Sequence, residues 1–426
     1  MSTPSFDKVN IFSQADKRSE AEERWVSFQP YLFFKGYRLR SRYQPDWVPS
    51  WKGKSTSALS LDAEDSFDPA PVRRLDAIRI KDGQQVMLKM LVPPTEGNEG
   101  KNEYALLHYF SSPALKDHPD NHVVPCLDSF PIPDIDSGRF VVMPLLSPYH
   151  TLPFYNLAEV HDFLHQLFKG LLFMHKNNTA HLDIASPNVM MDARPLYTEP
   201  FHPFYQSLSL DATRILEPRY HRSQKHTRYY FIDLGYSVQF DDSSAPWAVL
   251  GSQARELAPE QETGVPYDPF SVDVYQLGKM IQKDVIPKIK GIEFLEPLVH
   301  EMTRRNPAER STLVHAQSSM NTAFLGISGW KYRWPIVPEE AGWRQRVWNK
   351  TKVEKAEIAN DRIASLDDTL VGFSDGSKIV RSHIRLVRGN ERADALDLAG
   401  TNTRPTPIFA GTFTWFKAHA TQRVVR

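Results

Sequence analysis

Cysteine is nearly missing from this sequence, and so is any excess of charge of one sign. Cys126 is the single cysteine among 426 residues, so a disulfide within the chain is excluded and a reducing compartment is expected. Lys plus Arg and Asp plus Glu both number 51. No overall field therefore favours nucleic acid or an acidic membrane surface as a partner.

Long apolar runs are also missing. Residues 1–23 are polar and charged, without the apolar stretch of a secretory leader. No run reaches the ~20 apolar residues that a membrane-spanning helix needs. We therefore expect an intracellular protein, cytoplasmic or nuclear, with no membrane partner. The chain is 41% hydrophobic and has 24 Phe, which is enough for a core in one large two-lobed domain or in two to three smaller ones.

The first 70 residues fall into two segments. Residues 1–24 are polar and are predicted to be disordered or loosely helical, whereas residues 25–70 form an aromatic-rich extension that starts at Trp25. Aromatic clusters bury large areas, so we expect packing against a neighbouring lobe. The interleaved basic residues Lys35, Arg38, Arg40 and Arg42 leave a base-stacking surface as the alternative. Their alternation over residues 37–43 is typical of one face of a strand, so we do not expect nucleic acid as a partner.

A β-hairpin follows the extension. Alternation over residues 75–80 and an apolar run over 86–91 predict two strands, and Asp82-Gly83 between them is a turn signal. Lys89 lies in the middle of the second strand. A buried lysine needs a counter-charge or a ligand because an unpaired buried charge is costly. The alternative is a lysine on the solvent face of an edge strand.

Further elements follow the hairpin in order. Residues 100–110 have helical spacing and carry Glu103 where it could reach Lys89. Short strands are predicted over 123–130 and 139–143, then a stiff proline-containing connector over 144–148. Residues 158–176 are a clear amphipathic helix that ends at Asn177. Residues 193–227 lack periodicity and are predicted to be a loop insertion, and their His residues lack the spacing of zinc ligands.

Two short patterns carry the chemistry. His181-Leu182-Asp183 is followed five residues later by Asn188, and Asp233 stands two residues before Gly235. An acid near a substrate hydroxyl, an Asn for a metal ion and a second Asp before a glycine are the parts used in protein-kinase phosphoryl transfer.

In this order the residues resemble the protein-kinase fold, across residues 75–320, and the chain resembles kinase-like proteins of basidiomycete fungi. Lys89 resembles the strand lysine that reaches the nucleotide phosphates, and Glu103 resembles its helix partner. Met143 takes the gatekeeper position, with the hinge from Pro144 to Leu146 expected to bind adenine. The remaining matches are His181 and Asp183 (H-R-D), Asn188, Asp233, Leu234 and Gly235 (D-F-G), Glu260 (A-P-E), Asp273 in the anchoring helix, and Arg310, which resembles the partner of Glu260.

The resemblance implies an α+β, bilobal fold with an N-lobe at 71–145 and a C-lobe at 146–345. It implies ATP and Mg²⁺ as cofactors and a protein substrate of unknown identity. Asp183 would be the base, Lys89 would hold phosphates, and Asn188 and Asp233 would hold Mg²⁺. His181, Leu234, Gly235, Glu260, Asp273 and Arg310 would be structural.

The chain departs from the family pattern at three places. No G-x-G-x-x-G precedes the lysine strand, and residues 70–83 contain one glycine, Gly83. Leu182 replaces the usual arginine, and Ala185 stands where many serine/threonine kinases carry lysine. The missing glycine loop leaves a second interpretation open, which is a pseudokinase that serves as a binding or scaffolding module.

Residues 346–426 are predicted to be a tail of mostly low order. Within it, residues 371–400 resemble the first and last motifs of ribonuclease H domains, with Asp375 and Asp394 as two of the metal-binding carboxylates. Nineteen residues separate these two positions, and a domain needs ~50 or more to enclose a core. We therefore interpret the segment as a remnant without nuclease activity.

Overall fold

The computed structural model describes residues 15–52, 63–66, 72–92, 102–241, 247–251 and 253–336. The chain divides into units at 1–340 and 341–426, and all described residues belong to the first. They combine helices with antiparallel sheet, as the predicted α+β class requires. The predictions for residues 1–14 and for the tail at 346–426, with its ribonuclease H-like remnant, lie outside the described residues.

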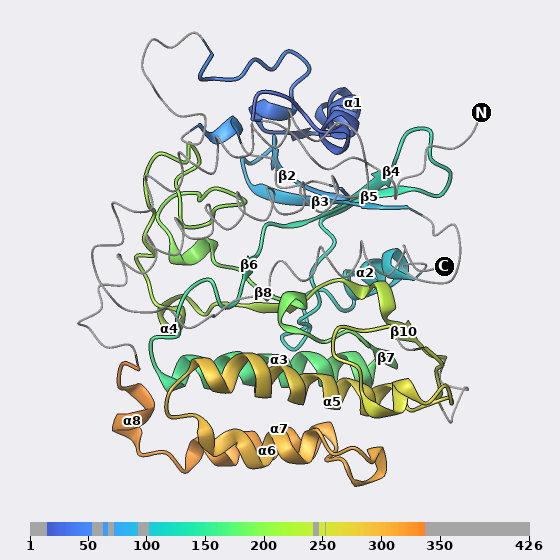
Figure 1. Cartoon of the computed structure of the whole chain (residues 1–426), viewed down its shortest axis with the longest axis vertical. Helices are drawn as coiled ribbons and strands as arrows, with labels where there is room; N and C mark the ends of the chain where they lie inside the picture. Colours follow the sequence, from blue (N-terminus) through green and yellow to red (C-terminus); the bar gives the residue numbers. More distant parts are fainter. Residues whose placement is uncertain are drawn as a thin grey trace, which may run out of the picture. The chain divides into compact units, whose positions relative to one another are not determined.

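A five-stranded antiparallel sheet carries the lysine strand (Figure 1). Its order is β1 (Tyr37–Arg38), β2 (Arg74–Arg79), β3 (Gln85–Leu91), β5 (Arg139–Pro144) and β4 (Asp128–Pro131). The predicted hairpin is confirmed: β2 pairs with β3, and Gly83 in the turn has φ +71°, a conformation that glycine adopts without strain. The predicted strand over 123–130 is shorter than expected. Pro125 cannot donate to a sheet ladder, and Val124 instead donates its N–H to Phe231.

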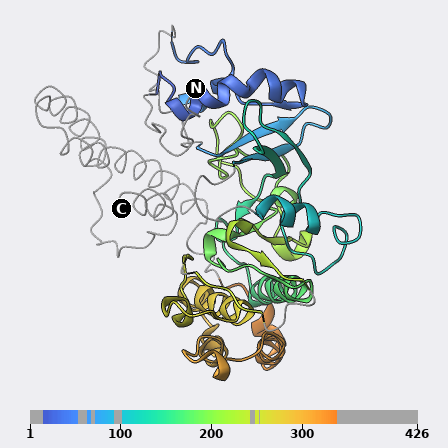
Figure 2. The same ribbon diagram turned by 90° about the vertical axis from the view of Figure 1, so that its right-hand side faces the viewer.

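Helix α1 (Glu20–Phe34) covers one face of this sheet, as the side view in Figure 2 shows. Ser19 and Glu22 form a capping box at its start. The domain boundary predicted at residue 24 therefore falls inside a helix, and disorder is not observed for Glu20–Arg24. Trp25 is fully buried and belongs to one cluster with strand residues such as Leu88. The packing interpretation of the aromatic extension agrees with this cluster.

Two of the four basic residues named in the extension, Arg40 and Arg42, form internal ion pairs, whereas Lys35 and Arg38 are exposed. Arg40 binds Asp76 and Glu64, and the fully buried Arg42 pairs with Glu22. Arg42 lies in a 3₁₀ turn at Ser41–Tyr43, so the strand predicted from alternation over 37–43 ends at Arg38. Paired and buried guanidinium groups are not available to nucleic-acid phosphates.

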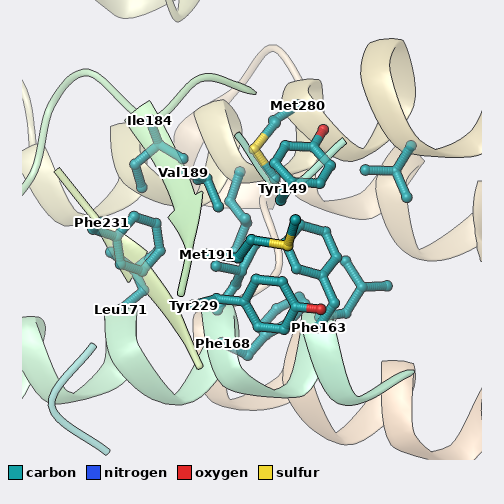
Figure 3. Packing of buried hydrophobic residues seen from close by; sticks show 14 of the residues in the cluster. Tyr149, Phe163, Phe168, Leu171, Ile184, Val189, Met191, Tyr229, Phe231 and Met280 are labelled. Atoms are coloured by element: carbon teal, nitrogen blue, oxygen red, sulfur yellow. The ribbon is translucent and has the colours of Figure 1, made fainter. Parts of the chain in front are cut away.

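Several helices lie together away from this sheet (Figure 1). The long α3 (Leu157–Lys176) agrees with the amphipathic helix predicted over 158–176 and runs beside α5 (Pro269–Met280). The other helices are α2 (Glu103–Phe110), α4 (Arg222–Lys225), α6 (Glu296–Met302), α7 (Leu313–Leu325) and α8 (Gly329–Arg333). Figure 3 shows side chains of the main core, where Phe163 and Tyr229 pack together with Tyr149.

Short strands lie between the sheet and the helices. β6 (Ser147–Pro148), β8 (Val189–Met191) and β9 (Tyr229–Phe231) form a three-stranded sheet, and β7 (Thr179–Ala180) pairs with β10 (Val238–Gln239). β7 ends directly before His181, β8 begins directly after Asn188, and β9 ends two residues before Asp233. This places the two sequence patterns of the candidate site side by side although about fifty residues separate them in the sequence.

The insertion at 193–227 is mostly irregular, as predicted, but it is packed. Phe201 and Tyr205 are buried, and Phe201 forms an isolated bridge with Ser209. The insertion also reaches the five-stranded sheet, because Gln85 of β3 donates to the carbonyl of Phe201. A segment without sequence periodicity is therefore an integral part of this fold.

Candidate functional site

Lys89 on β3 lies between two carboxylates from distant parts of the chain. Its Nζ is 2.5 Å from Glu103 Oε1 on α2 and 2.9 Å from Asp233 Oδ1 after β9. The Lys89 side chain is 15% exposed and the Glu103 side chain 5%, so the contact is largely shielded from water. The predicted pairing of Lys89 with Glu103 is confirmed, and the solvent-facing alternative for Lys89 is excluded.

Burial and ion pairing act against each other in this group. Burial alone would lower the pKa of Lys89, but the charges of Asp233 and Glu103 raise it above its ordinary value. Burial alone would raise the pKa of Asp233. The Lys89 ammonium outweighs this effect and holds the pKa of Asp233 far below its usual range. Burial raises the pKa of Glu103, against the attraction of Lys89. Lys89 and Asp233 therefore form the strongly ionised pair at neutral pH.

Asp273 of α5 anchors the turn that presents Asp183. Its carboxylate accepts hydrogen bonds from the backbone N–H groups of His181 and Leu182, at 2.9 and 2.7 Å. Leu182 has a φ of +63°, a left-handed conformation that costs energy for a non-glycine residue. Gln276, one turn further along α5, accepts from the N–H of Ile184. The fully buried Asp273 thus fixes a strained turn, as its predicted structural role requires.

His181 also packs rather than facing the site. It is fully buried, and its Nε2 lies 3.2 Å from the carbonyl oxygen of Ile232. This contact joins the Asp183 turn to the segment that carries Asp233. The predicted structural role of His181 agrees with this position.

Asp183 is held by the two segments on either side of it. Asn188 Nδ2 donates to Asp183 Oδ2 at 2.7 Å and to the Asp183 carbonyl at 2.8 Å. The backbone N–H of Arg255 donates to Asp183 Oδ1 at 2.8 Å, and the Arg255 guanidinium lies 3.5 Å from Oδ2. Burial raises the pKa of Asp183, and the Arg255 charge opposes that rise. Asp183 is therefore a shielded carboxylate whose ionisation depends on Arg255.

Asn188 and Asp233 lie at neighbouring strand ends. The backbone N–H of Ile232 donates to the Asn188 carbonyl at 3.0 Å, next to the pairing of Val189 with Phe231. Asn188 uses Nδ2 toward Asp183, and Asp233 meets Lys89 through Oδ1. Within the described residues no donor contacts Asn188 Oδ1 or Asp233 Oδ2. An amide oxygen and a carboxylate oxygen are both ligand types that suit Mg²⁺, which keeps several waters and takes few protein ligands.

This arrangement differs from a dedicated protein metal cage. The described residues contain no cluster of three or more His, Cys, Asp or Glu side chains that could hold a metal ion. A metal ion held by Asn188 and Asp233 would take its remaining ligands from water or from a bound molecule.

The predicted hinge is engaged by the insertion. Pro144 is the last residue of β5, opposite Val86, and Met143 is opposite Met87. The carbonyl oxygen of Leu146 accepts a hydrogen bond of 3.0 Å from Gln206 Nε2. One of the backbone acceptors expected to meet adenine therefore already has a donor from residues 193–227.

The remaining predicted residues, which were expected to be structural, lie around the site. Arg310 and Glu260 form a two-pronged ion pair of 2.6 and 3.0 Å. Leu234 is fully buried in the main core. At Gly235 an added Cβ would lie 3.7 Å from Asp233 Oδ1 and 3.9 Å from Glu103 Oε2, which is ordinary van der Waals contact, so the backbone of Gly235 lies beside both carboxylates but the space there would accept a Cβ. The structure thus brings together Lys89, Glu103 and Asp233, and separately Asp183 with Asn188.

Three residues at the site were missed in the sequence. Arg74 is the direct cross-strand partner of Lys89, and the predicted hairpin with its turn could have indicated that register. Gln206 and Arg255 lie in segments without periodicity, so nothing in the sequence pattern pointed to them.

The described residues also contain a cavity of about 580 Å³, lined by residues such as Phe294, Trp330 and Trp334. None of its lining residues belongs to the site around Lys89, so it has no part in that chemistry.

No helix among the described segments has the length and apolar character needed to cross a membrane. No protein-family model matches the sequence, and no curated protein matches it either.

Proposed function

We propose that this chain is a protein kinase that transfers the γ-phosphate of ATP to a protein hydroxyl. The observation that carries the proposal is Lys89 on β3 between Glu103 of α2 and Asp233. Protein kinases need a β3 lysine paired with a helix glutamate, together with an aspartate for the metal. The same proposal makes the fold bilobal and kinase-like, with the five-stranded sheet and α2 as one lobe and the helices as the other.

Each residue has a separate task in this proposal. Asp183 accepts or orients the proton of the acceptor hydroxyl, which its ionised form can do at neutral pH. Lys89 holds phosphate oxygens and is itself fixed by Glu103. Pro144 and Leu146 provide backbone groups to adenine. Catalysis by such a site is positioning and charge neutralisation rather than covalent chemistry.

Asn188 and Asp233 are the residues that would hold Mg²⁺. The metal ion, when bound, neutralises charge on the phosphates during transfer. Glu103 keeps Lys89 in place while Asp233 serves the metal. Asp273 and His181 keep the Asp183 turn in its strained conformation, so the base is aimed before substrate arrives.

Transfer of label from [γ-³²P]ATP to generic protein acceptors tests the proposal. We expect Mg²⁺-dependent label transfer that falls by ~10²-fold or more in Asp183→Asn, the range for loss of a general base. Asp233→Asn should lose the Mg²⁺-dependent transfer as well. The matched control is Asp128→Asn, because Asp128 starts β4 outside this site. Label transfer that is equal in wild type, Asp183→Asn and Asp233→Asn overturns the proposal.

A second candidate is a pseudokinase that binds partners without transferring phosphate. The contact of Gln206 with the Leu146 carbonyl favours it, because adenine would have to share or displace a donor at the hinge. A thermal-shift series with ATP and Mg²⁺ separates the two, since a ligand of the native state raises its stability. Turnover that is lost in Lys89→Met rules the pseudokinase out, whereas a folded wild type that shows no shift and no transfer supports it.

A further inference from the structure

We propose that Arg74 binds the nucleotide phosphates from the strand beside Lys89, in place of the missing glycine loop. This inference rests on the proposed function and adds a residue to its binding site. In protein kinases a glycine-rich loop covers the phosphates with backbone N–H groups. This chain has no such loop, so another donor is needed on the same side of the site.

The structure shows where that loop would have to lie. Residues 70–83, which contain one glycine, include β2 and the start of the hairpin turn. The connection that precedes β2 runs from residue 39 to residue 73, and its one glycine is Gly53. Backbone approaches a phosphate closely where side chains do not interfere, which is why glycine is used there. Arg74 is the first residue of β2, directly after this connection.

Strand register places Arg74 on the same face as Lys89. The two residues are direct partners in the β2–β3 ladder, and directly opposed residues in antiparallel strands project to the same side. The neighbouring pair, Leu75 and Leu88, belongs to the cluster beneath α1 on the opposite face. Arg74 is therefore on the face from which Lys89 reaches Glu103 and Asp233.

The charges around Arg74 agree with this placement. Burial lowers the pKa of Arg74, while the carboxylates of Asp233 and Glu103 act to raise it. Arg74 in turn stabilises the ionised form of Asp233, after Lys89. Arg74 thus interacts with the same two carboxylates that hold Lys89.

A count of charges explains what Arg74 adds. Among the residues that the structure describes, three cations, Lys89, Arg74 and Arg255, interact with three carboxylates, Glu103, Asp183 and Asp233. The formal charges of these six side chains sum to zero. With Lys89 as the only strand cation, the two carboxylates beside it would repel a phosphate chain. A guanidinium next to Lys89 removes that repulsion, and its planar fork matches two phosphate oxygens.

Calorimetric titration of the full-length protein with MgATP and with adenosine tests the inference. Adenosine has the base and the sugar but no phosphate. For Arg74→Gln, which removes the charge and the guanidinium fork but keeps a polar side chain, we expect the Kd for MgATP to rise ~10- to 100-fold, the range for a hydrogen bond to a charged group. The Kd for adenosine should stay unchanged. Arg74→Lys should fall between wild type and Arg74→Gln, because it keeps the charge and loses the fork.

Arg79→Gln is the matched control, since Arg79 ends the same strand and pairs with Asp82 away from the site. It should bind both ligands as the wild type does. Unchanged adenosine affinity in Arg74→Gln also shows that the variant is folded. If Arg74→Gln binds MgATP as tightly as wild type, or more tightly, the inference is overturned while the proposed function stands. If the wild type binds neither ligand, the proposed function fails first, and the inference fails with it.

Discussion

At the scale of single residues, the contact between Arg255 and Asp183 controls when the proposed base is ionised. Burial raises the pKa of Asp183, and Arg255, 3.5 Å away, restrains the rise. Because its pKa is raised, Asp183 becomes protonated at a higher pH than an exposed aspartate does when the pH falls. For the proposed phosphate transfer, we therefore expect this pair of residues to set the pH at which activity is lost on the acidic side.

Replacing Arg255 should move that pH. In Arg255→Ala the backbone N–H still donates to Asp183, but the positive charge is gone. We expect the acidic limb of the kcat/KM profile to shift to higher pH, whereas Arg255→Lys should keep it near the wild-type position. A label-transfer assay run across pH 5 to 8 measures the shift. A limb that does not move in Arg255→Ala would show that Arg255 does not tune the base.

His122 makes stability depend on pH. It is buried, its Nδ1 lies 2.8 Å from the Tyr229 carbonyl, and burial lowers its pKa from 6.5 to about 4. The unfolded chain therefore binds a proton more readily between pH 6.5 and 4. Stability from the neutral form is full above pH 6.5 and is lost as pH falls through this window. The contribution lost between pH 7 and pH 5 is about 2 kcal/mol.

His122→Asn tests this account because Asn can donate the same hydrogen bond without titrating. Between pH 7 and pH 5 the wild type should lose free energy of unfolding through His122, and the variant should not. We expect the loss in His122→Asn to be smaller by about 2 kcal/mol. The exposed His315 provides the control, and His315→Asn should keep the wild-type slope. Urea unfolding at the two pH values measures the difference, and identical slopes in all three proteins would refute the prediction.

Several site residues could be predicted because their chemistry leaves a trace in the sequence. A lysine inside an apolar strand, as at Lys89, requires a counter-charge wherever it is buried. Arg255 leaves no such trace, since an arginine in a loop is most often solvated. Gln206 lies in a segment without periodicity, and its contact with Leu146 depends on how the insertion packs.

At the scale of elements, close helix packing depends on glycine. An added Cβ at Gly278 of α5 would lie 2.8 Å from Met302 Cβ and 2.9 Å from Thr303 Cγ2. Both atoms are close to the backbone at the end of α6, so they cannot move aside easily. Gly278 therefore sets the distance between α5 and the chain at the end of α6.

Gly278→Ala should destabilise the protein although alanine favours helix. The helix gains up to ~1 kcal/mol from the change, and overpacking costs typically ~1–3 kcal/mol. We expect a net loss, measured by chemical unfolding. In the control, Gly329→Ala, nothing lies within 4 Å of the new Cβ, so a change within ~0.5 kcal/mol is expected. Equal effects of the two substitutions would contradict the packing account.

The elements also differ in how well the sequence predicts them. α3 has a broad apolar stripe and begins and ends within a residue of its predicted bounds. α1 was not predicted, because Pro30 and the aromatic run obscure its periodicity. Its signal was the capping box at Ser19 and Glu22. The strand expected over 37–43 ends at Arg38, because polar alternation in a short segment also fits a 3₁₀ turn.

At the scale of the whole molecule, the N-terminal extension is part of the folded core. Trp25 is fully buried and lies 5.8 Å from Phe140 of β5, ring centre to ring centre. Phe34, at the end of the same helix, is 82% exposed. Substitutions at Trp25 and Phe34 therefore compare a buried and an exposed aromatic side chain on the same helix.

Trp25→Ala should cost ~3–5 kcal/mol in the free energy of unfolding, as for other buried aromatic residues. Phe34→Ala should change it by less than ~0.5 kcal/mol. Thermal or chemical unfolding measures both. A mild effect of Trp25→Ala, similar to that of Phe34→Ala, would show that the extension is dispensable for the sheet.

The position of Lys89 between two carboxylates also sets an order of events during synthesis. Glu103 follows Lys89 by 14 residues, and Asp233 follows it by 144. At the ribosome's ~5–20 residues per second, roughly 7 to 30 s pass between completion of the first partner and of the second. A fragment that stops between residues 103 and 233 carries the lysine with one of its two acids. The complete charge network can therefore form only in a chain that has been synthesised past residue 233.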